Sequence, residues 1–339
     1  MIRTALLTCV LLTAAAALPA RASDKAGEWT ASVSENHPEF LQISLHLGPH
    51  EQDGTRMKLS EFSGLEGSQI HSPSRVNVQF ELRREAGTIA FDGMFHDGHG
   101  AGEFTFTANR DFTRQLHGMG LQFSTKKSSE EDALFELAIF DVSTDFIHSM
   151  QAIGYDVPLE MYEQFRIFDV NPDYVRDMDK VGFDHLPAEK LVETRIHGAT
   201  PDYIRQMRAS GDDLTLDQYV ESRIFQVTPE FAAEMAKDGY PGLKRDVLVQ
   251  FRIQGVTTEF IREIGNLGYT HVPAEKLVEM RIHGVTPQFI KRVAAAGYRD
   301  VPIDKLVQMR IFNIEPEMVR ALDDASRKGK TKDKDVETD

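Results

Sequence analysis

The sequence predicts an α+β fold, in which a small antiparallel β domain precedes an α-solenoid of short two-helix repeats. Apolar and polar residues alternate in several stretches between residues 29 and 108, which is typical of strands with one buried face. Farther along, an Arg-Ile pair recurs six times at intervals of 28 or 29 residues. A period of that length indicates stacked supersecondary units, each of which needs its neighbours to bury its apolar face.

The first 22 residues have the features of a secretory signal peptide. Arg3 precedes an apolar run over residues 5–18, and the triplet Ala20-Arg21-Ala22 is a small-x-small cleavage signal. The run is shorter than the ~20 residues that a bilayer-spanning helix needs, and no later stretch approaches that length. We therefore expect an exported protein, periplasmic or extracellular, whose mature chain has no transmembrane segment.

Composition limits the partners of the mature chain. The formal net charge is −15, and removal of residues 1–22 takes away two basic residues and no acidic one, which gives −17. Nucleic acids and anionic membrane surfaces attract clustered Lys and Arg, so a chain this acidic argues against both. Cys9, the only cysteine, lies in the signal peptide, so we expect no disulfide and no thiolate metal site.

The β domain is expected over residues 23–108. The clearest strand is RVNVQFELRR at residues 75–84, and the same alternation predicts strands at residues 40–47, 88–95 and 103–107, with Trp29 beginning the first strand. Turn residues, such as the Asp-Gly-His-Gly run at residues 97–100, separate them. Four to six strands in a meander cannot cover their own apolar face, so we expect a neighbour to cover it.

The helical repeat domain is expected over residues 109–325, with six to seven helix pairs and a closing helix at residues 315–325. A first helix begins at a polar N-cap that is often followed by proline, as at Thr286-Pro287, and ends at a glycine-aromatic pair such as Gly297-Tyr298. We expect complete pairs to start near residues 143, 171, 200, 228, 257 and 286, and a degenerate pair with an insertion to precede them. Residues 326–339 are charged and almost free of apolar side chains, which predicts a disordered tail.

A recurring arginine ends each second helix, and in the last copy Arg310 lies on the same helical face as Leu306, four residues earlier. The set is Arg166, Arg195, Arg223, Arg252, Arg281 and Arg310. An acidic residue follows seven positions later in five of the six cases. We interpret the arginines as a structural ladder, in which each one bridges its helix to the next through that carboxylate or through helix-end carbonyls. The alternative is that they line a groove for an anionic ligand.

No catalytic signature is found, neither G-x-S-x-G nor H-E-x-x-H, and no motif implies a cofactor. The best metal candidate is the group His96, Asp97 and His99, but turn residues that need positive φ explain this stretch better. In a repeat scaffold the binding residues are those that vary between repeats. The candidate partner contacts are Asp169, His197, Gln226, Gln254, His283 and Asn313, which follow the Arg-Ile pairs.

Three segments also resemble a known family. FDGMFHDGHGAGEFTFTAN at residues 91–109, GVTPQFIKRVAAAGY at residues 284–298 and VPAEKLVEMRIHG at residues 272–284 look like an uncharacterised family of exported bacterial proteins. Similar segments occur attached to membrane-embedded zinc peptidases of the β-lactam-sensor type. The resemblance implies an extracytoplasmic role in sensing or as an accessory protein, although this sequence lacks the peptidase signature.

From these observations we expect a non-enzymatic extracytoplasmic scaffold that binds a protein or peptide partner in the cell envelope, as an accessory to envelope sensing or signalling. One alternative is a hydrolase or metal-dependent enzyme with a site where the β and helical regions meet, near His96, Asp97, His99 and His117. A structural protein of the envelope is the other alternative.

Overall fold

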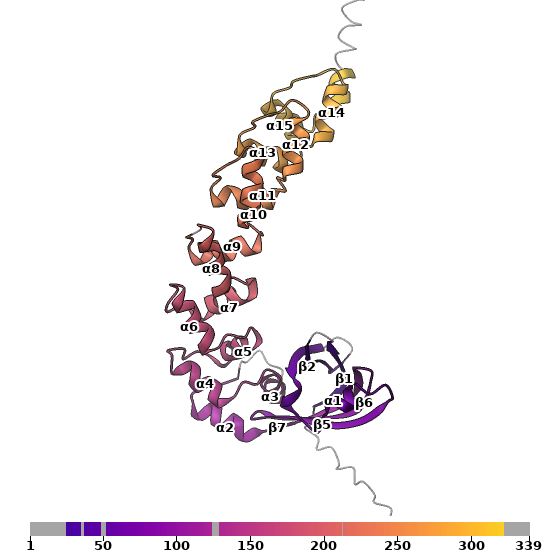
Figure 1. The fold of residues 1–339 in the computed structure, drawn as a ribbon, viewed down its shortest axis with the longest axis vertical. Coiled ribbons are helices and arrows are strands. Elements are labelled where there is room, and N and C mark those ends of the chain that lie inside the picture. The colour runs from indigo at the N-terminus through magenta and orange to yellow at the C-terminus, as the bar shows by residue number, and fades with distance from the viewer. Residues whose placement is uncertain (1–24, 35–36, 49–51, 124–128, 212, 322–339) are drawn as a thin grey trace, which may run out of the picture. The chain divides into compact units, whose positions relative to one another are not determined.

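The structure, a computed structural model, describes residues 25–34, 37–48, 52–123, 129–211 and 213–321. The expected signal peptide at residues 1–22 and the expected tail at residues 326–339 lie outside these ranges. The chain divides into two units, residues 1–173 and residues 174–339. The first unit contains the sheet and the first helices, and the second unit contains the remaining helices (Figure 1). The predicted α+β class with a helical repeat region is therefore confirmed.

Seven antiparallel strands form one sheet in the order β3-β2-β1-β7-β6-β5-β4. Their bounds are β1 Lys25–Ser34, β2 His37–His46, β3 Gln52–Lys58, β4 Phe62–Ser63, β5 Val76–Arg84, β6 Gly87–His96 and β7 His99–Ala108. The strands with clear alternation, β2, β5, β6 and β7, match the prediction. The sequence did not reveal β3 or β4, because β3 has a single large apolar side chain, Met57, and β4 is two residues long.

The core of the sheet forms around Trp29, which is fully buried. Its ring centroid lies 5.3 Å from that of Phe80 and 5.5 Å from that of Phe95, and its Nε1 donates a hydrogen bond to the carbonyl of Asp92 (3.1 Å). A side chain at Gly93 would place its Cβ 2.7 Å from the indole ring. The absence of a side chain there lets the backbone of β6 approach the indole.

Helix α3 supplies the cover that the sheet was expected to need. It spans Glu130–Ile139 and follows α2, Arg110–Gly118. The ring of Phe135 stacks on Phe104 of β7 at 5.7 Å and meets Phe106 edge-on at 5.1 Å. The sequence predicts an insertion in this segment, but α3 has the place of a second helix. Its end, Ile139-Phe140-Asp141, repeats the Ile-Phe-Asp at residues 167–169 that ends α5.

The helix pairs follow one another with the predicted period. The first helices are α4 Thr144–Gln151, α6 Pro172–Lys180, α8 Pro201–Ala209, α10 Pro229–Lys237, α12 Thr258–Gly265 and α14 Pro287–Ala295. The second helices are α5 Leu159–Ile167, α7 Ala188–His197, α9 Leu216–Ile224, α11 Arg245–Gln254, α13 Ala274–Ile282 and α15 Ile303–Ile311. Residues 316–321 are helical as well, where the closing helix was predicted.

Local signals set the ends of the first helices as the sequence predicted. The hydroxyl of Thr286 accepts a hydrogen bond from the backbone N–H of Phe289, and the N-cap residues of α4, α8, α10 and α12 do the same three positions on. At the other end, Gly297 has a φ of +101° and the N–H of Tyr298 donates to the carbonyl of Val293. This six-residue closure stops the helix because only glycine adopts that conformation without strain.

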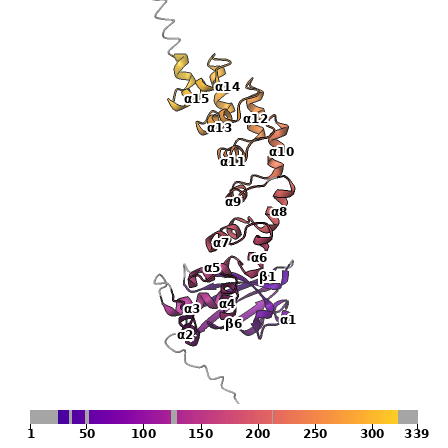
Figure 2. The ribbon, with the colours of Figure 1, turned by 90° about the vertical axis from the view of Figure 1, so that its left-hand side faces the viewer.

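Stacking of the pairs supplies the core of the second unit. Second helices α11 and α13 contact each other, as do α13 and α15, while α12 contacts α14. Figure 2 shows the second helices α7, α9, α11, α13 and α15 in one row and the first helices α8, α10, α12 and α14 in another. Apolar residues from Val227 to Val307 form one continuous cluster through these layers. Among the described residues, no helix is long and apolar enough to cross a bilayer.

Tyr240 and Tyr269 each bind one helix pair to the following pair. Tyr240 donates its hydroxyl to the carbonyl of Val272, and Tyr269 donates to that of Val301, both at 2.7 Å. Burial raises the pKa of both phenols, so the folded chain favours the protonated form. The stability that the two protonated phenols contribute to the fold is fully present below the unfolded pKa of ~10, and it is lost as pH rises through the higher folded pKa.

Replacement of Tyr240 or Tyr269 by phenylalanine should lower the free energy of unfolding by about 1 kcal/mol each at pH 7, because a partly buried carbonyl loses its donor. Urea denaturation at pH 7 and at pH 10.5 measures the effect. The double variant should show a smaller loss of stability between the two pH values than the parent chain. An equal loss in both proteins would contradict the assignment.

Candidate functional site

All six recurring arginines stack on an aromatic ring, a contact that the sequence does not predict. Each guanidinium lies over the ring at the third position of the first helix of its own pair, 20 or 21 residues earlier. The pairs are Arg166 over Phe146 (5.1 Å), Arg195 over Tyr174 (4.0 Å), Arg223 over Tyr203 (4.9 Å), Arg252 over Phe231 (3.7 Å), Arg281 over Phe260 (5.2 Å) and Arg310 over Phe289 (5.1 Å). The recurring cation–π contact joins the two helices of a pair.

The arginines also reach the end of the preceding second helix. Arg281 donates from Nε to the carbonyl of Gln254 at 3.0 Å. A Cβ at Gly255 would lie 2.8 Å from the guanidinium of Arg281, so glycine leaves space for it. The sequence predicts helix-end carbonyls among the acceptors, but on the helix that follows the arginine. The structure directs Arg281 to the pair before it.

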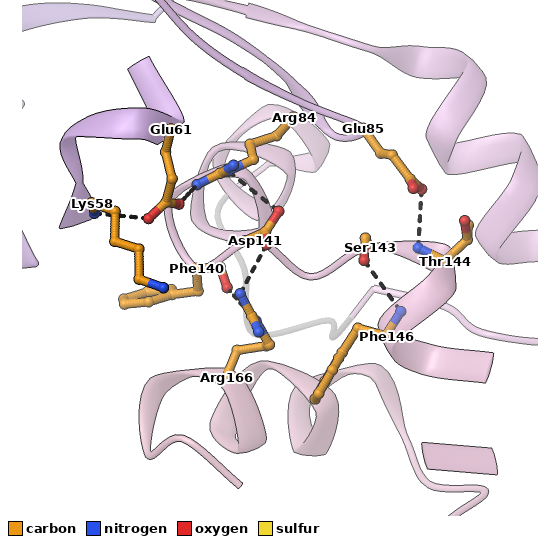
Figure 3. A network of polar contacts seen from close by, with 10 residues as sticks. All are labelled: Lys58, Glu61, Arg84, Glu85, Phe140, Asp141, Ser143, Thr144, Phe146 and Arg166. Atoms are coloured by element: carbon orange, nitrogen blue, oxygen red, sulfur yellow. Dashed lines mark hydrogen bonds and ion pairs between the residues drawn. The ribbon is translucent and has the colours of Figure 1, made fainter. Parts of the chain in front are cut away.

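The ladder begins in the first unit, at a network that joins the sheet to the first complete helix pair (Figure 3). Arg166 donates from Nε to the carbonyl of Phe140 (2.9 Å) and from a terminal nitrogen to Asp141 (2.9 Å). Asp141 also pairs with Arg84 at the end of β5 (3.3 Å), and Arg84 bonds to Glu61. The carboxylate of Asp141 therefore lies between an arginine of the sheet and an arginine of α5.

A second set of charges connects the other ends of the second helices. The ammonium of Lys190 lies 2.7 Å from Asp217 in the first turn of α9, and that of Lys276 lies 2.6 Å from Asp304 in the first turn of α15. Hydrogen bonding to these carboxylates, and to a glutamate of its own helix, raises the pKa of each lysine. Each bridge joins residues 27 or 28 positions apart and so connects one second helix to the following one.

The isoleucine after each arginine faces solvent in every complete pair. The side chains are Ile167 in the first unit and Ile196, Ile224, Ile253, Ile282 and Ile311 in the second, and they are 42 to 54% exposed. We call the five in the second unit the isoleucine row. Packed helices are about 9 Å apart, so neighbouring members of the row should be separated by a similar distance. An exposed isoleucine at the same place in every repeat is a patterned apolar surface that packing does not require.

In the degenerate pair, the residue at the place of these isoleucines is buried. Ile139 of α3 is the counterpart of these isoleucines, since Phe140 and Asp141 follow it as Phe168 and Asp169 follow Ile167. Helix α3 packs on β6 and β7, and Ile139 is 3% exposed. The position therefore accommodates burial when another surface is packed on the helix.

The candidate partner contacts lie in the turns next to the exposed isoleucines and fall into two groups. Asp169, Gln226 and Asn313 have φ values of 52° to 54°, in the place taken by Gly198, Gly255 and Gly284 in the other pairs. They close the helix and thus have a structural role whether or not a partner contacts them. His197, Gln254 and His283 lie one residue earlier, at the helix end, where other pairs have a phenylalanine. Whether either group binds a partner stays a prediction.

The candidate enzyme residues do not form a site within the described ranges. His96 and His99 flank the turn between β6 and β7, where Asp97 (φ 50°) and Gly98 (φ 78°) have the predicted positive φ. All three candidate side chains of this turn are exposed. His117 lies on α2, with its ring 6.3 Å from that of Phe123. The described part of the chain has no cluster of three or more His, Cys, Asp or Glu residues that could hold a metal ion.

Sequence reasoning missed the isoleucine row because an isoleucine beside an arginine reads as a core residue. Four of the six second helices have a Leu-Val pair four and three positions before the arginine, and the isoleucine lies four positions after that valine, at the edge of the apolar face. The packing of neighbouring pairs, and not the pattern of one helix, therefore decides that this isoleucine is exposed.

Comparison with known proteins finds no matching family model, no matching curated protein and no matching solved structure.

Proposed function

We propose that the protein is an exported, non-enzymatic scaffold whose helix pairs bind a protein or peptide partner in the cell envelope. The isoleucine row is the observation that carries this proposal. Each member is half exposed, and each is adjacent to an arginine that stacks within its own pair. The apolar surface therefore recurs with the repeat but contributes little to the core. Large patterned apolar surfaces on soluble proteins are typical of interaction sites.

Two further observations support the proposal. The signal-like composition of residues 1–22 favours export, and the resemblance of the repeats to exported bacterial proteins favours a role in the envelope. Repeat arrays bind extended partners because successive repeats present the same side chains at regular spacing. A partner segment with regularly spaced apolar side chains would fit the row, and the resemblance favours an accessory role in envelope sensing or signalling.

A triple variant tests the function. The parent chain should capture a partner from envelope extract, and the variant with Ile196→Gln, Ile253→Gln and Ile282→Gln should not. Mass spectrometry identifies the captured partner, and titration of the purified partner against both proteins measures the affinities. Since these side chains are half exposed, stability should change little.

The matched control is the triple variant Ala209→Gln, Ala233→Gln and Ala295→Gln, which introduces the same side chain at exposed positions of first helices. It should retain the partner with unchanged affinity. Equal capture by the parent chain and the isoleucine variant, or equal loss in both variants, would remove the isoleucine row as the binding surface.

A further inference from the structure

The described residues after α15 are exposed at positions that are buried after the earlier second helices. Ile314 is 37% exposed, whereas its counterparts in the five preceding pairs, such as Val285 and Val256, are 0 to 1% exposed. Met318 is 58% exposed, while Phe260 and Phe289, which have its place in earlier pairs, are 5% and 2% exposed. We call the surface formed by Phe312, Ile314 and Met318 the exposed end.

The structure shows what covers these positions elsewhere. In each complete pair the second helix packs on the first helix, and its arginine lies over the ring at the place of Met318. That arginine also donates to the carbonyl at the place of Phe312, as Arg281 does to Gln254. The position after that carbonyl is Asn313, whose counterpart Asp141 accepts from Arg166. The exposed end therefore presents the acceptors and the apolar surface that an incoming arginine-bearing helix uses.

A third contact extends the same comparison. Lys190 and Lys276 each bind the acidic residue in the first turn of the next second helix. Lys305 has their place in α15, and its described hydrogen bond is to Gln308 of its own helix (3.1 Å). Its ammonium has the same place as those of Lys190 and Lys276, which bind the first turn of the next second helix. Three features at one end, a lysine, an apolar surface and helix-end acceptors, match the three contacts between successive pairs.

We propose that the exposed end binds an amphipathic helix of a partner protein that has the chemistry of this chain's own second helices. Such a helix carries an acidic residue in its first turn, a Leu-Val pair two and three positions on, and an arginine six positions on, as Asp304, Leu306, Val307 and Arg310 do in α15. The contact continues the interface between successive pairs. The inference rests on the proposed interaction role but uses a different surface from the isoleucine row.

A peptide from the chain itself is the probe. The peptide of residues 298–314, acetylated and amidated, is titrated against the full protein by fluorescence anisotropy. We expect saturable one-to-one binding. Met318→Lys in the protein should weaken it about tenfold, because it replaces apolar surface with a charge that repels the arginine. Arg310→Ala in the peptide should also weaken it about tenfold.

A charge exchange identifies the orientation. Lys305→Glu in the protein should weaken binding of the parent peptide about threefold, and a peptide with Asp304→Lys should restore it. The matched control is Met94→Lys, the same substitution at an exposed methionine of β6, which should leave the affinity unchanged. The isoleucine-row triple variant should also bind the peptide normally, which separates this inference from the proposed function.

Several results would overturn the inference. Lack of saturable binding would do so, as would equal affinity of the peptide for the Met318→Lys variant and the parent chain. Sedimentation that shows self-association of the parent chain, lost in the Met318→Lys variant, would identify a second copy of this chain as the occupant and exclude a foreign helix.

Discussion

Replacement of Arg281 by alanine should lower the free energy of unfolding by about 2 kcal/mol. The change removes the cation–π contact with Phe260 and the hydrogen bond to the carbonyl of Gln254, which then lacks its donor. Urea denaturation followed by far-UV circular dichroism measures the loss. Arg281→Lys should restore only part of it, because an ammonium cannot both stack flat on the ring and keep the direction of the Nε donor.

Two comparisons show whether the arginine acts as a structural link. Arg299→Ala, at an exposed position between α14 and α15, should change stability by less than about 0.5 kcal/mol. A double-mutant cycle of Arg281→Ala with Phe260→Leu should give a coupling of about 1 kcal/mol. If Arg281→Ala instead kept full stability and lost partner binding, the arginines would line an anion-binding groove, which is the alternative that the sequence left open.

Gly93→Ala should cost about 3 kcal/mol and disrupt the packing of the β-sheet. The new Cβ would lie 2.3 Å from the carbonyl oxygen of Ala101 and 2.7 Å from the indole ring of Trp29. Since one neighbour is backbone and the other is a fully buried ring, neither can move without breaking strand pairing or core packing. Trp29 is the only tryptophan, so its fluorescence reports the change directly.

Gly118→Ala is the matched control for this substitution. Gly118 ends α2 in the same unit, and a Cβ there meets no atom within 4 Å. Alanine should leave the emission of Trp29 unchanged and should keep or slightly raise stability, since it reduces the freedom of the unfolded chain. Equal losses in both glycine variants would mean that the close packing of β6 on Trp29 is not the cause.

The helical repeats could be predicted from the sequence because their ends depend on local chemistry. A threonine that accepts from the N–H three residues on, and a glycine with positive φ followed by an aromatic residue, act within one turn of chain. The strands β2, β5, β6 and β7 could be predicted for a similar reason, since their alternation records which face is buried. Strand β3 has no such alternation. Only its hydrogen bonding to β2 defines it as a strand, and the sequence of β3 does not show that pairing.

The contacts between pairs could not be predicted in the same way. Arg281 and Phe260 are 21 residues apart, and nothing in the chain between them indicates that one will cover the other. The acidic residue seven positions after the arginine was a nearer partner in sequence. The ring was missed because a recurring aromatic residue is already explained as core.

The sequence by itself determined the repeat period, the caps of the first helices and the separation of strands from helices, because these depend on interactions within a few residues. The tertiary structure alone decided that each arginine stacks on the ring of its own pair, that α3 covers the sheet, and that one isoleucine in each pair remains exposed. These features depend on how stacked helices divide their surfaces between neighbour and solvent. Which side chains face a neighbouring helix and which face solvent is set only when the helices pack, so the sequence of a single helix does not reveal it.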